Sequence, residues 1–351
     1  MRHSNPRWWL RLAHEVSACP GCASSRITLL DVFSIPRTPE RRRVAFIGGC
    51  YACGLLFANP LPADEQLQRY YSEEGPWAGL RAERNSGVEA ANVRRRGWKK
   101  PRPKASLPPR ARSLFNALAP YVPVYAPPPG AKVLDFGCGD GKFLNRLQDY
   151  GWETYGIEPS THAAFPRHGQ LISPPQDGTF DFVFLNHVLE HVTTPLDLLR
   201  QLAGSLREGG VLFVSVPRVD TLPQHGDLKY CLSGARHVVC FSETCLKGLL
   251  ARAGFATAGR LDAKELDAAF TEGKPLRLRL VAVRTRRPGP VPDSPLAPAR
   301  EALARHARAR ESLTARVRRL LPVRLRGALL GRAADRRVRD RKRALVETSG
   351  R

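Results

Sequence analysis

The chain has 351 residues, of which 42% are hydrophobic, and it carries a formal net charge of +24 at pH 7. This length accommodates a full α/β domain with one or two small appendages. No apolar run approaches the roughly 20 residues that span a bilayer, and residues 1–16 lack the apolar core of a signal peptide. These features exclude a membrane-spanning chain and predict a cytoplasmic protein, in which cysteines act as metal ligands or buried thiols.

The positive charge is concentrated in two segments. Residues 81–112 contain 11 basic and 2 acidic residues, and residues 286–351 contain 19 basic and 6 acidic residues. The segments have net charges of +9 and +13, which leaves about +2 for the rest of the chain. Such segments favour anionic surfaces, namely lipid headgroups, nucleic acid or a polyanionic glycan. The alternative is a solvated, partly disordered surface without a binding role.

Two pairs of cysteines come first along the chain. Cys19 and Cys22 form one C-x-x-C pair, and Cys50 and Cys53 form the other. Four thiolates on two tight turns are the ligand set of a structural Zn²⁺. Residues 27–33 and 43–47 lie between the pairs and have strand composition, so the segment predicts a zinc ribbon. A complete thiolate set leaves no open coordination position, which favours a structural metal over a catalytic one.

A glycine-rich turn follows a predicted buried strand at residues 132–136. Gly137, Gly139 and Gly141 allow a sharp bend and close approach of a ligand to the backbone. The acid at the strand end, Asp135, suits a positively charged ligand rather than a pyrophosphate. A second predicted strand ends at Glu158. In nucleotide-binding α/β folds, a carboxylate at this position hydrogen-bonds the ribose hydroxyls.

Four blocks in the same order give the chain its resemblance to a known family. The blocks are residues 133–141, 156–160, 178–192 and 206–217. In this region the chain resembles a class I S-adenosylmethionine-dependent methyltransferase. The resemblance implies an α/β fold with a Rossmann-like, mostly parallel sheet. To this fold the sequence adds the small N-terminal zinc ribbon and a basic tail that is helical or disordered. Residues 161–175 are short for the family, so the adenine-contacting acid has no candidate and the sheet is expected to lack one short strand.

The resemblance also implies cofactor-binding residues. The glycine turn would hold the methionine part of S-adenosylmethionine, with Asp135 near its ammonium group, and Glu158 would bind the ribose hydroxyls. The predicted cofactor residues are Asp135, Gly137, Cys138, Gly139, Glu158 and Asn186.

Histidines are the candidates for acceptor chemistry. His187 and His191 follow the predicted strand at residues 180–185, and either could serve as general base on an acceptor hydroxyl or amine. Their spacing also permits a capping and packing role, and a metal role lacks a third nearby ligand in the sequence. His237 matches a histidine that lies before a helix in the family, and this implies a position in the acceptor pocket.

The N-terminal part resembles the zinc module of bacterial methyltransferases associated with sugars and surface polysaccharides. This similarity implies a small-molecule or glycan acceptor. The predicted divisions are an arm, a zinc-ribbon-like module, a helix with a basic linker or lid, the methyltransferase domain and a basic tail, at residues 1–16, 17–62, 63–110, 111–287 and 288–351.

Three interpretations remain open for the whole chain. Methyl transfer to a small acceptor is the first, RNA methylation is the second, and an inactive cofactor-binding scaffold is the third. Nucleic acid is the less favoured partner because the predicted catalytic domain is nearly neutral. The basic tail could lie on anionic lipid as an amphipathic helix, which would make the protein peripheral at the inner face of the membrane.

Overall fold

The computed structural model describes eleven stretches of the chain, and all structural statements refer to them. They are residues 16–36, 42–71, 131–139, 144, 152–158, 170–171, 178–225, 228–233, 236–260, 277–293 and 295–320. Most of the predicted helix and basic linker or lid at residues 63–110, and the tail beyond residue 320, lie outside them.

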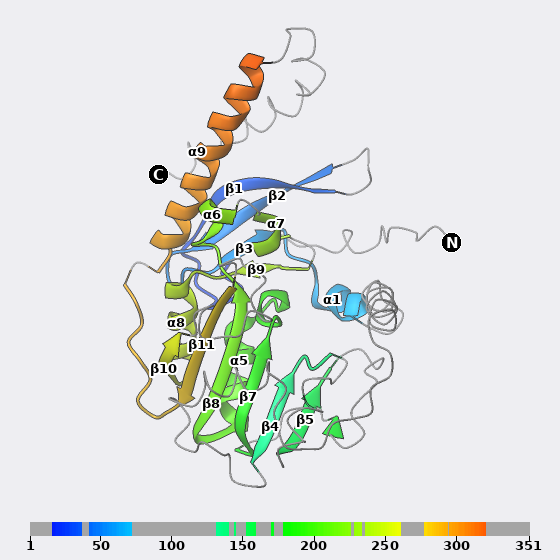
Figure 1. The fold of residues 1–351 in the computed structure, drawn as a ribbon, viewed down its shortest axis with the longest axis vertical. Helices are drawn as coiled ribbons and strands as arrows, with labels where there is room; N and C mark the ends of the chain where they lie inside the picture. Colours follow the sequence, from blue (N-terminus) through cyan, green and yellow to red (C-terminus); the bar gives the residue numbers. More distant parts are fainter. Residues whose placement is uncertain are drawn as a thin grey trace, which may run out of the picture. The chain divides into compact units, whose positions relative to one another are not determined.

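A seven-stranded sheet forms the centre of the fold (Figure 1). Its order is β10-β11-β8-β7-β4-β5-β6, and the five strands from β8 to β6 run parallel. β11 is antiparallel to both of its neighbours. The strands are β4 (Lys132–Phe136), β5 (Glu153–Ile157), β6 (Gln170–Leu171), β7 (Phe180–Asn186), β8 (Leu206–Pro217), β10 (Phe255–Arg260) and β11 (Arg277–Arg284). The predicted mostly parallel α/β fold is confirmed.

The sheet is complete despite the short segment after Glu158. β6 has two residues and pairs with β5 through Tyr155 and Gly156. The expectation of a missing strand was therefore wrong, although the strand is very short. Two residues suffice here because an edge strand needs to pair on one side only.

The order of the strands reverses direction at β4, in the middle of the sheet. β4 lies between β5 and β7, so the chain leaves β4 toward one side and later returns to its other side. In open α/β sheets, ligands bind beside the carboxyl ends of the strands at such a reversal of direction.

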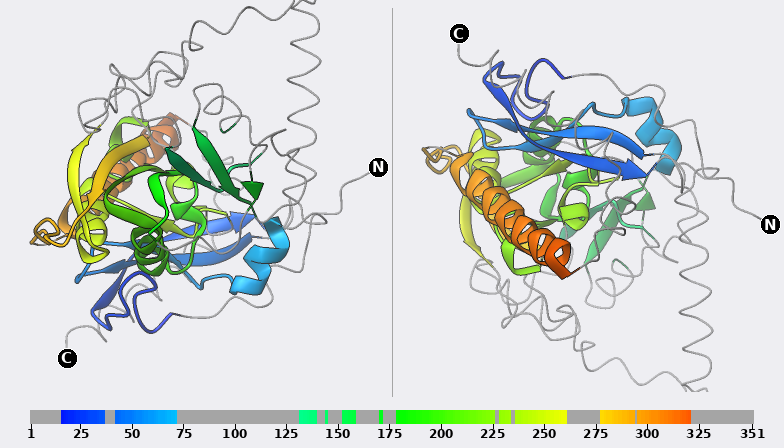
Figure 2. Two further views of the ribbon diagram at one scale, coloured as in Figure 1. Left: turned by 90° about the horizontal axis from the view of Figure 1, so that it is seen from below. Right: turned by 90° about the horizontal axis from the view of Figure 1, so that it is seen from above.

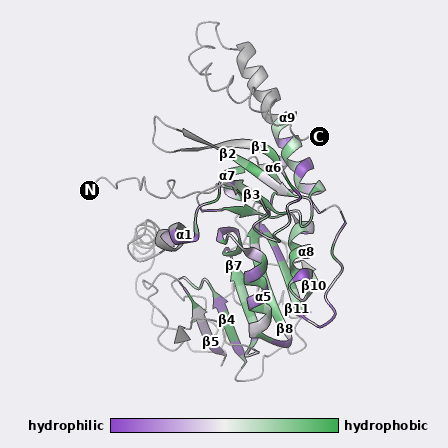
Figure 3. Ribbon diagram, turned by 180° about the vertical axis from the view of Figure 1, so that it is seen from behind, coloured by the Kyte–Doolittle hydropathy of each residue, from purple (hydrophilic) through white to green (hydrophobic). Residues whose placement is uncertain are grey.

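Two helices pack side by side on one face of the sheet. These are α5 (Pro195–Ser205) and α8 (Glu243–Arg252), which contact each other and the strands β8 and β10 (Figure 3). Their buried leucines meet the apolar residues that run along β7 and β8. Ser242 caps α8, because its hydroxyl accepts a hydrogen bond from the N–H of Cys245 at 3.1 Å.

A second, four-stranded sheet forms a separate layer at the carboxyl ends of the parallel strands (Figures 1 and 2). Its order is β1-β2-β3-β9, and all pairs are antiparallel. Its strands are β1 (Ile27–Pro36), β2 (Arg42–Cys50), β3 (Leu56–Asn59) and β9 (Val239–Cys240). β9 comes from the second half of the chain, between β8 and β10 of the large sheet, and buried residues of both sheets belong to one apolar core.

Short helices complete the carboxyl side of the sheet. α1 (Asp64–Tyr71) follows the small sheet, and the 3₁₀ helix η2 (Leu189–His191) follows β7. The predicted irregular segment after β8 contains two short helices, α6 (Leu222–His225) and α7 (Leu228–Cys231).

The chain divides into two compact units, Met1–Leu303 and Ala304–Arg351. The helix α9 (Ala297–Leu320) begins in the first unit, where Ala299, Ala302 and Leu303 are buried. Among the described helices, none is both long enough and apolar enough to cross a bilayer. The finer divisions predicted from the sequence stay predictions.

Candidate functional site at the carboxyl ends of the parallel strands

The glycine turn begins where β4 ends. Gly137 has a φ of +77°, a left-handed conformation that glycine adopts without steric cost. The N–H groups of Gly137 and Cys138 both donate to the carbonyl oxygen of Ile157, at 2.7 and 3.1 Å. A Cβ atom at Gly137 would lie 2.4 Å from Cγ2 of Val188. The packing of the turn itself therefore requires glycine here, whether or not a ligand lies over it.

Two carboxylates stand at the ends of neighbouring strands. Asp135 of β4 pairs with Gly156 of β5, and Glu158 directly follows β5. Burial of Asp135, together with the negative charge of Glu158, raises the pKa of Asp135 to about 7. Glu158 Oε2 accepts a hydrogen bond from the N–H of Gly139 at 2.8 Å. The structure therefore brings both acids to the glycine turn.

The remaining predicted cofactor residues lie at the same edge. Cys138 is buried within the turn, and Asn186 is the exposed last residue of β7. All six predicted cofactor residues thus follow or end β4, β5 and β7, where open α/β sheets bind ligands. Their role in binding stays a prediction. Most of the segment at residues 161–175, where an adenine pocket was sought, lies outside the described residues.

Glu190 is a fully buried carboxylate in η2. His187 Nδ1 lies 2.9 Å from Glu190 Oε1, and His191 Nε2 lies 3.8 Å from the same oxygen. Burial alone raises the pKa of Glu190, but the His187 hydrogen bond and the neighbouring histidines outweigh it, so its pKa is lower than usual. We call Glu190, His187, His191 and His237 the Glu190 cluster.

His191 and His237 face each other with ring centroids 4.8 Å apart. His191 Nδ1 lies 2.8 Å from the carbonyl oxygen of Arg236, and His237 Nδ1 lies 2.6 Å from that of Tyr230. A carbonyl oxygen only accepts, so each Nδ1 carries the proton of the neutral ring. Burial lowers the pKa of both histidines, that of His237 to about 4. Both rings are therefore neutral near pH 7, with a lone pair on Nε2.

His187 has an unusual backbone conformation. Its φ is +57°, in the left-handed region that residues other than glycine rarely adopt. Its N–H donates to the carbonyl oxygen of Ser215 in β8 at 2.9 Å, which holds the backbone in place. Strained residues of this kind cluster at functional sites. The three predicted acceptor histidines, His187, His191 and His237, are thus brought together, and their roles stay predictions.

Sequence reasoning missed two features of this cluster. Glu190 was not among the predicted site residues, although it is the buried centre of the cluster. Tyr71 was not among them either, yet its hydroxyl lies 2.7 Å from His191 Nδ1. Burial raises the pKa of Tyr71, so this hydroxyl keeps its proton. No sequence signal links Tyr71 to a residue 120 positions away.

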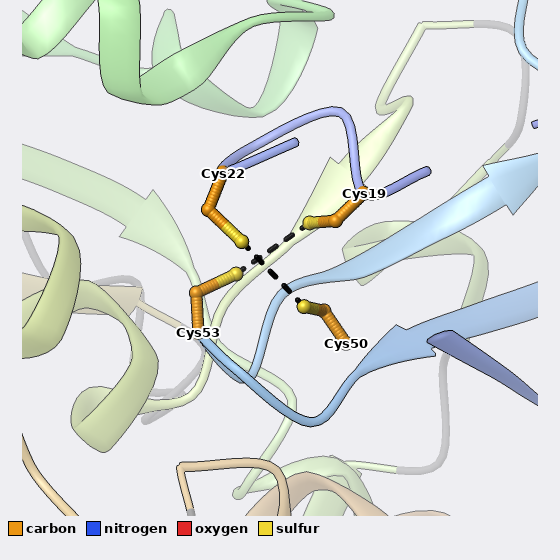
Figure 4. Close-up of side chains that lie close together, drawn as sticks. All are labelled: Cys19, Cys22, Cys50 and Cys53. Atoms are coloured by element: carbon orange, nitrogen blue, oxygen red, sulfur yellow. Dashed lines mark hydrogen bonds between the residues drawn. The ribbon is translucent and has the colours of Figure 1, made fainter. Parts of the chain in front are cut away.

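The four cysteines of the two pairs converge at the end of the small sheet (Figure 4). The Sγ atoms of Cys19 and Cys53 are 3.6 Å apart, as are those of Cys22 and Cys50. Tetrahedral Zn–S bonds of about 2.3 Å place the sulfur atoms about 3.8 Å apart, which matches this arrangement. Hydrogen bonds from Cys19 and Cys50, together with burial, hold the pKa of Cys53 far above its usual value. Four thiolates this close need a cation between them, so the cluster fits Zn²⁺.

The other cysteines lie in the interior. Cys138, Cys231, Cys240 and Cys245 are buried and form no disulfide bond. Burial, followed by hydrogen bonding to Cys231, holds the pKa of Cys240 well above its usual value. Cys240 therefore stays protonated, and all four side chains belong to the packed interior.

Comparison with known proteins gives a match over the part of the chain that contains the glycine turn and the Glu190 cluster. Residues 106–258 match the family model of a methyltransferase domain. The chain is 31% identical over 111 residues to a ubiquinone biosynthesis O-methyltransferase of Xanthomonas campestris pv. campestris, which covers 27% of this chain and 46% of the relative. It is 35% identical over 130 residues to a tRNA U34 carboxymethyltransferase of Citrifermentans bemidjiense, which covers 32% of this chain and 38% of the relative. The chain thus spans less than half of either relative.

Solved structures show only a distant likeness. The 1,6-didemethyltoxoflavin-N1-methyltransferase of Burkholderia thailandensis is 18% identical and superimposes with a TM-score of 0.40, covering 73% of this chain and 99% of that one. A methyltransferase from Mesorhizobium loti is 20% identical with a TM-score of 0.37, covering 48% of this chain and 98% of that one.

We predict that Gly137→Ala lowers the free energy of unfolding by more than the strain of a left-handed alanine, which is about 1–2 kcal/mol. The excess comes from the contact of the new Cβ with Val188. Gly209→Ala is the matched control, because its φ of +75° is the same but no atom lies within 4 Å of the Cβ position. Urea denaturation compares the two variants, and Val188→Ala should relieve the excess in the double variant. Equal losses for the two glycine variants would refute the packing argument.

Proposed function

We propose that this chain, whose residues 106–258 match the family model of a methyltransferase domain, is a class I methyltransferase that transfers a methyl group from S-adenosylmethionine to a small-molecule or carbohydrate acceptor. The observation that carries the proposal is the pairing of two acids at the glycine turn. Asp135 is buried and Glu158 lies against the turn, beside the reversal in strand order.

The residues at this edge fit the cofactor. Asp135 has a raised pKa because it is a buried acid near another acid, and the ammonium group of a bound cofactor would stabilise its ionised form. Glu158 already accepts one N–H hydrogen bond, from Gly139, and its carboxylate can accept more from ribose hydroxyls. When bound, S-adenosylmethionine supplies an activated methyl group on a sulfonium centre.

The main task of the protein in this reaction is to position the acceptor and the methyl donor. Transfer from such a donor would need the acceptor atom in line with the carbon–sulfur bond, so the residues at this end of the sheet would have to hold the two reactants in that geometry. The Glu190 cluster follows β7 at the same edge of the sheet, and we assign it to the acceptor side. His187 and His191 are the candidates for receiving the acceptor's proton, and His237 completes the wall of the acceptor pocket.

The named relatives support the proposal at the level of acceptor class. The printed name of one relative places it in ubiquinone biosynthesis as an O-methyltransferase, which favours a hydroxyl on a small molecule. The other is named for tRNA U34, and it keeps an RNA acceptor as the alternative. The association with sugars and the contact of the tail with anionic membranes rest on the sequence only.

We predict transfer of labelled methyl from S-adenosylmethionine into a small-molecule fraction of cell extract, identified by mass spectrometry. A parallel sample treated with ribonuclease separates the RNA alternative. Label that disappears with ribonuclease treatment would assign the acceptor to RNA. Cofactor binding without transfer to any fraction would favour the inactive scaffold.

The variant Glu158→Ala tests the proposed ribose contact of the cofactor. Loss of hydrogen bonds between a carboxylate and the ribose hydroxyls removes about 3 kcal/mol, or roughly 100-fold in affinity. Calorimetry with S-adenosylhomocysteine measures this loss, and Glu65→Gln on the exposed first turn of α1 is the control. Unchanged affinity in Glu158→Ala would remove this residue from the cofactor site.

The pH dependence of cofactor affinity tests Asp135. Its pKa of about 7 in the free protein means that a falling pH protonates it and removes the charge that attracts the ammonium group. Affinity should therefore fall roughly eightfold between pH 7.5 and pH 6 by linkage. Asp135→Asn should bind more weakly at pH 7.5 and lose most of this dependence. An equally steep dependence in the variant would place the titrating group elsewhere.

We further propose that the cysteine cluster holds a structural Zn²⁺. Treatment with a strong chelator should remove it and lower the midpoint of thermal unfolding, because the bound metal contributes folding free energy. Cys22→Ser should show the same lowered midpoint without chelator, whereas Cys231→Ser leaves the metal in place. Protein that keeps its midpoint after all metal has been removed would rule out a structural metal.

A further inference from the structure

We propose that Glu190, His191 and His237 form a second metal site, which binds a divalent cation of the zinc, iron(II) or manganese(II) class through one carboxylate and two imidazoles. The site is separate from the cysteine cluster and shares no residue with it. The metal site stands on its own geometry, and only its role in the reaction rests on the proposed function.

The three side chains already converge. One potential ligand atom from each lies within 4.8 Å of the others. Glu190 and His191 come from η2, and His237 directly precedes Val238, whose N–H donates to the carbonyl oxygen of Glu190 at 2.9 Å. This backbone hydrogen bond fixes the two segments to each other. Metal binding would then require only small side-chain movements to draw the ligand atoms together.

Both imidazoles are oriented as metal ligands usually are. A ligating histidine almost always donates its other ring N–H to a carbonyl or carboxylate, which fixes the tautomer and the direction of the ring. His191 does so toward Arg236 and His237 does so toward Tyr230. Each ring therefore has Nε2 left to bind a cation, and His191 Nε2 is the nitrogen nearer to Glu190.

Glu190 supplies the second, independent observation. Its side chain is fully buried, and Oε2 has no hydrogen-bond partner among the described residues. An ionised carboxylate is costly to bury unless each oxygen is hydrogen-bonded or bound to a cation. The hydrogen bond from His187 reaches Oε1 of Glu190 only. A cation at the cluster would satisfy the remaining oxygen, and this accounts for a charged residue in the interior.

The ligand types limit the class of metal. Two imidazoles and one carboxylate leave positions open for water or substrate, as in catalytic zinc sites and non-haem iron sites. The imidazole rings are only partly buried, with 20% of the His191 side chain exposed, so those positions can be reached from outside. On the proposed function, the open position would hold an acceptor oxygen and lower the pKa of its hydroxyl. His187 is not a ligand in this arrangement and can receive the proton.

Metal analysis of the full chain tests the site. Protein dialysed against micromolar Zn²⁺ and then against metal-free buffer should hold about two zinc ions, one in each cluster. His237→Gln should hold about one, because it removes an imidazole and leaves the four cysteines intact. His306→Gln in α9 is the control and should keep two.

Two further measurements separate loss of the metal site from unfolding of the variant and from loss of the cofactor site. Thermal unfolding of His237→Gln confirms that the variant is folded, and Glu190→Gln provides an independent removal of a ligand. Affinity for S-adenosylhomocysteine should be unchanged in both variants, so failure of the metal site and failure of the cofactor site are distinguishable. Equal zinc content in the wild type, His237→Gln and Glu190→Gln would overturn the proposal.

Discussion

The structure depends on keeping carboxylates at the carboxyl ends of a buried parallel sheet. Asp135 is the penultimate residue of β4 and Glu190 lies in η2 after β7, and both side chains are withdrawn from water. Burial disfavours the charged form of an acid unless neighbours compensate. A chain that only needed a stable sheet would place apolar residues there. Two buried acids, one in β4 and one shortly after the adjacent β7, therefore indicate that this side of the sheet is arranged around positive partners.

The small sheet and the segments joined to it supply the groups that surround Glu190. β9 pairs with β3, and the same segment carries His237 toward η2. α1, which follows the small sheet, brings the Tyr71 hydroxyl to His191. The cysteine cluster anchors the turn between β2 and β3, so it stabilises the layer that supplies these groups. Fold stability in the N-terminal part and side-chain placement at the candidate acceptor side are thus coupled.

Local patterns predicted much of this fold, and long-range pairing limited the rest. The glycine turn, the strand that carries Asp135 and the cysteine pairs each follow from a few adjacent residues. The Glu190 cluster does not, because it forms only when β9 crosses to a strand about 180 residues earlier in the chain. β6 escaped prediction for a different reason: two residues carry no periodicity.

The two buried acids respond to their surroundings in opposite directions, and this difference suggests different partners. The pKa of Asp135 is raised by burial and by Glu158, so Asp135 is partly protonated in the free protein. A bound cation would lower this pKa and ionise the side chain. The pKa of Glu190 is lowered because His187 and its neighbours outweigh burial, which favours the charged form. A buried carboxylate that favours its charged form, and whose Oε2 has no hydrogen-bond partner among the described residues, suits a resident ion. A titratable one suits a ligand that enters and leaves with each turnover, as a methyl donor must.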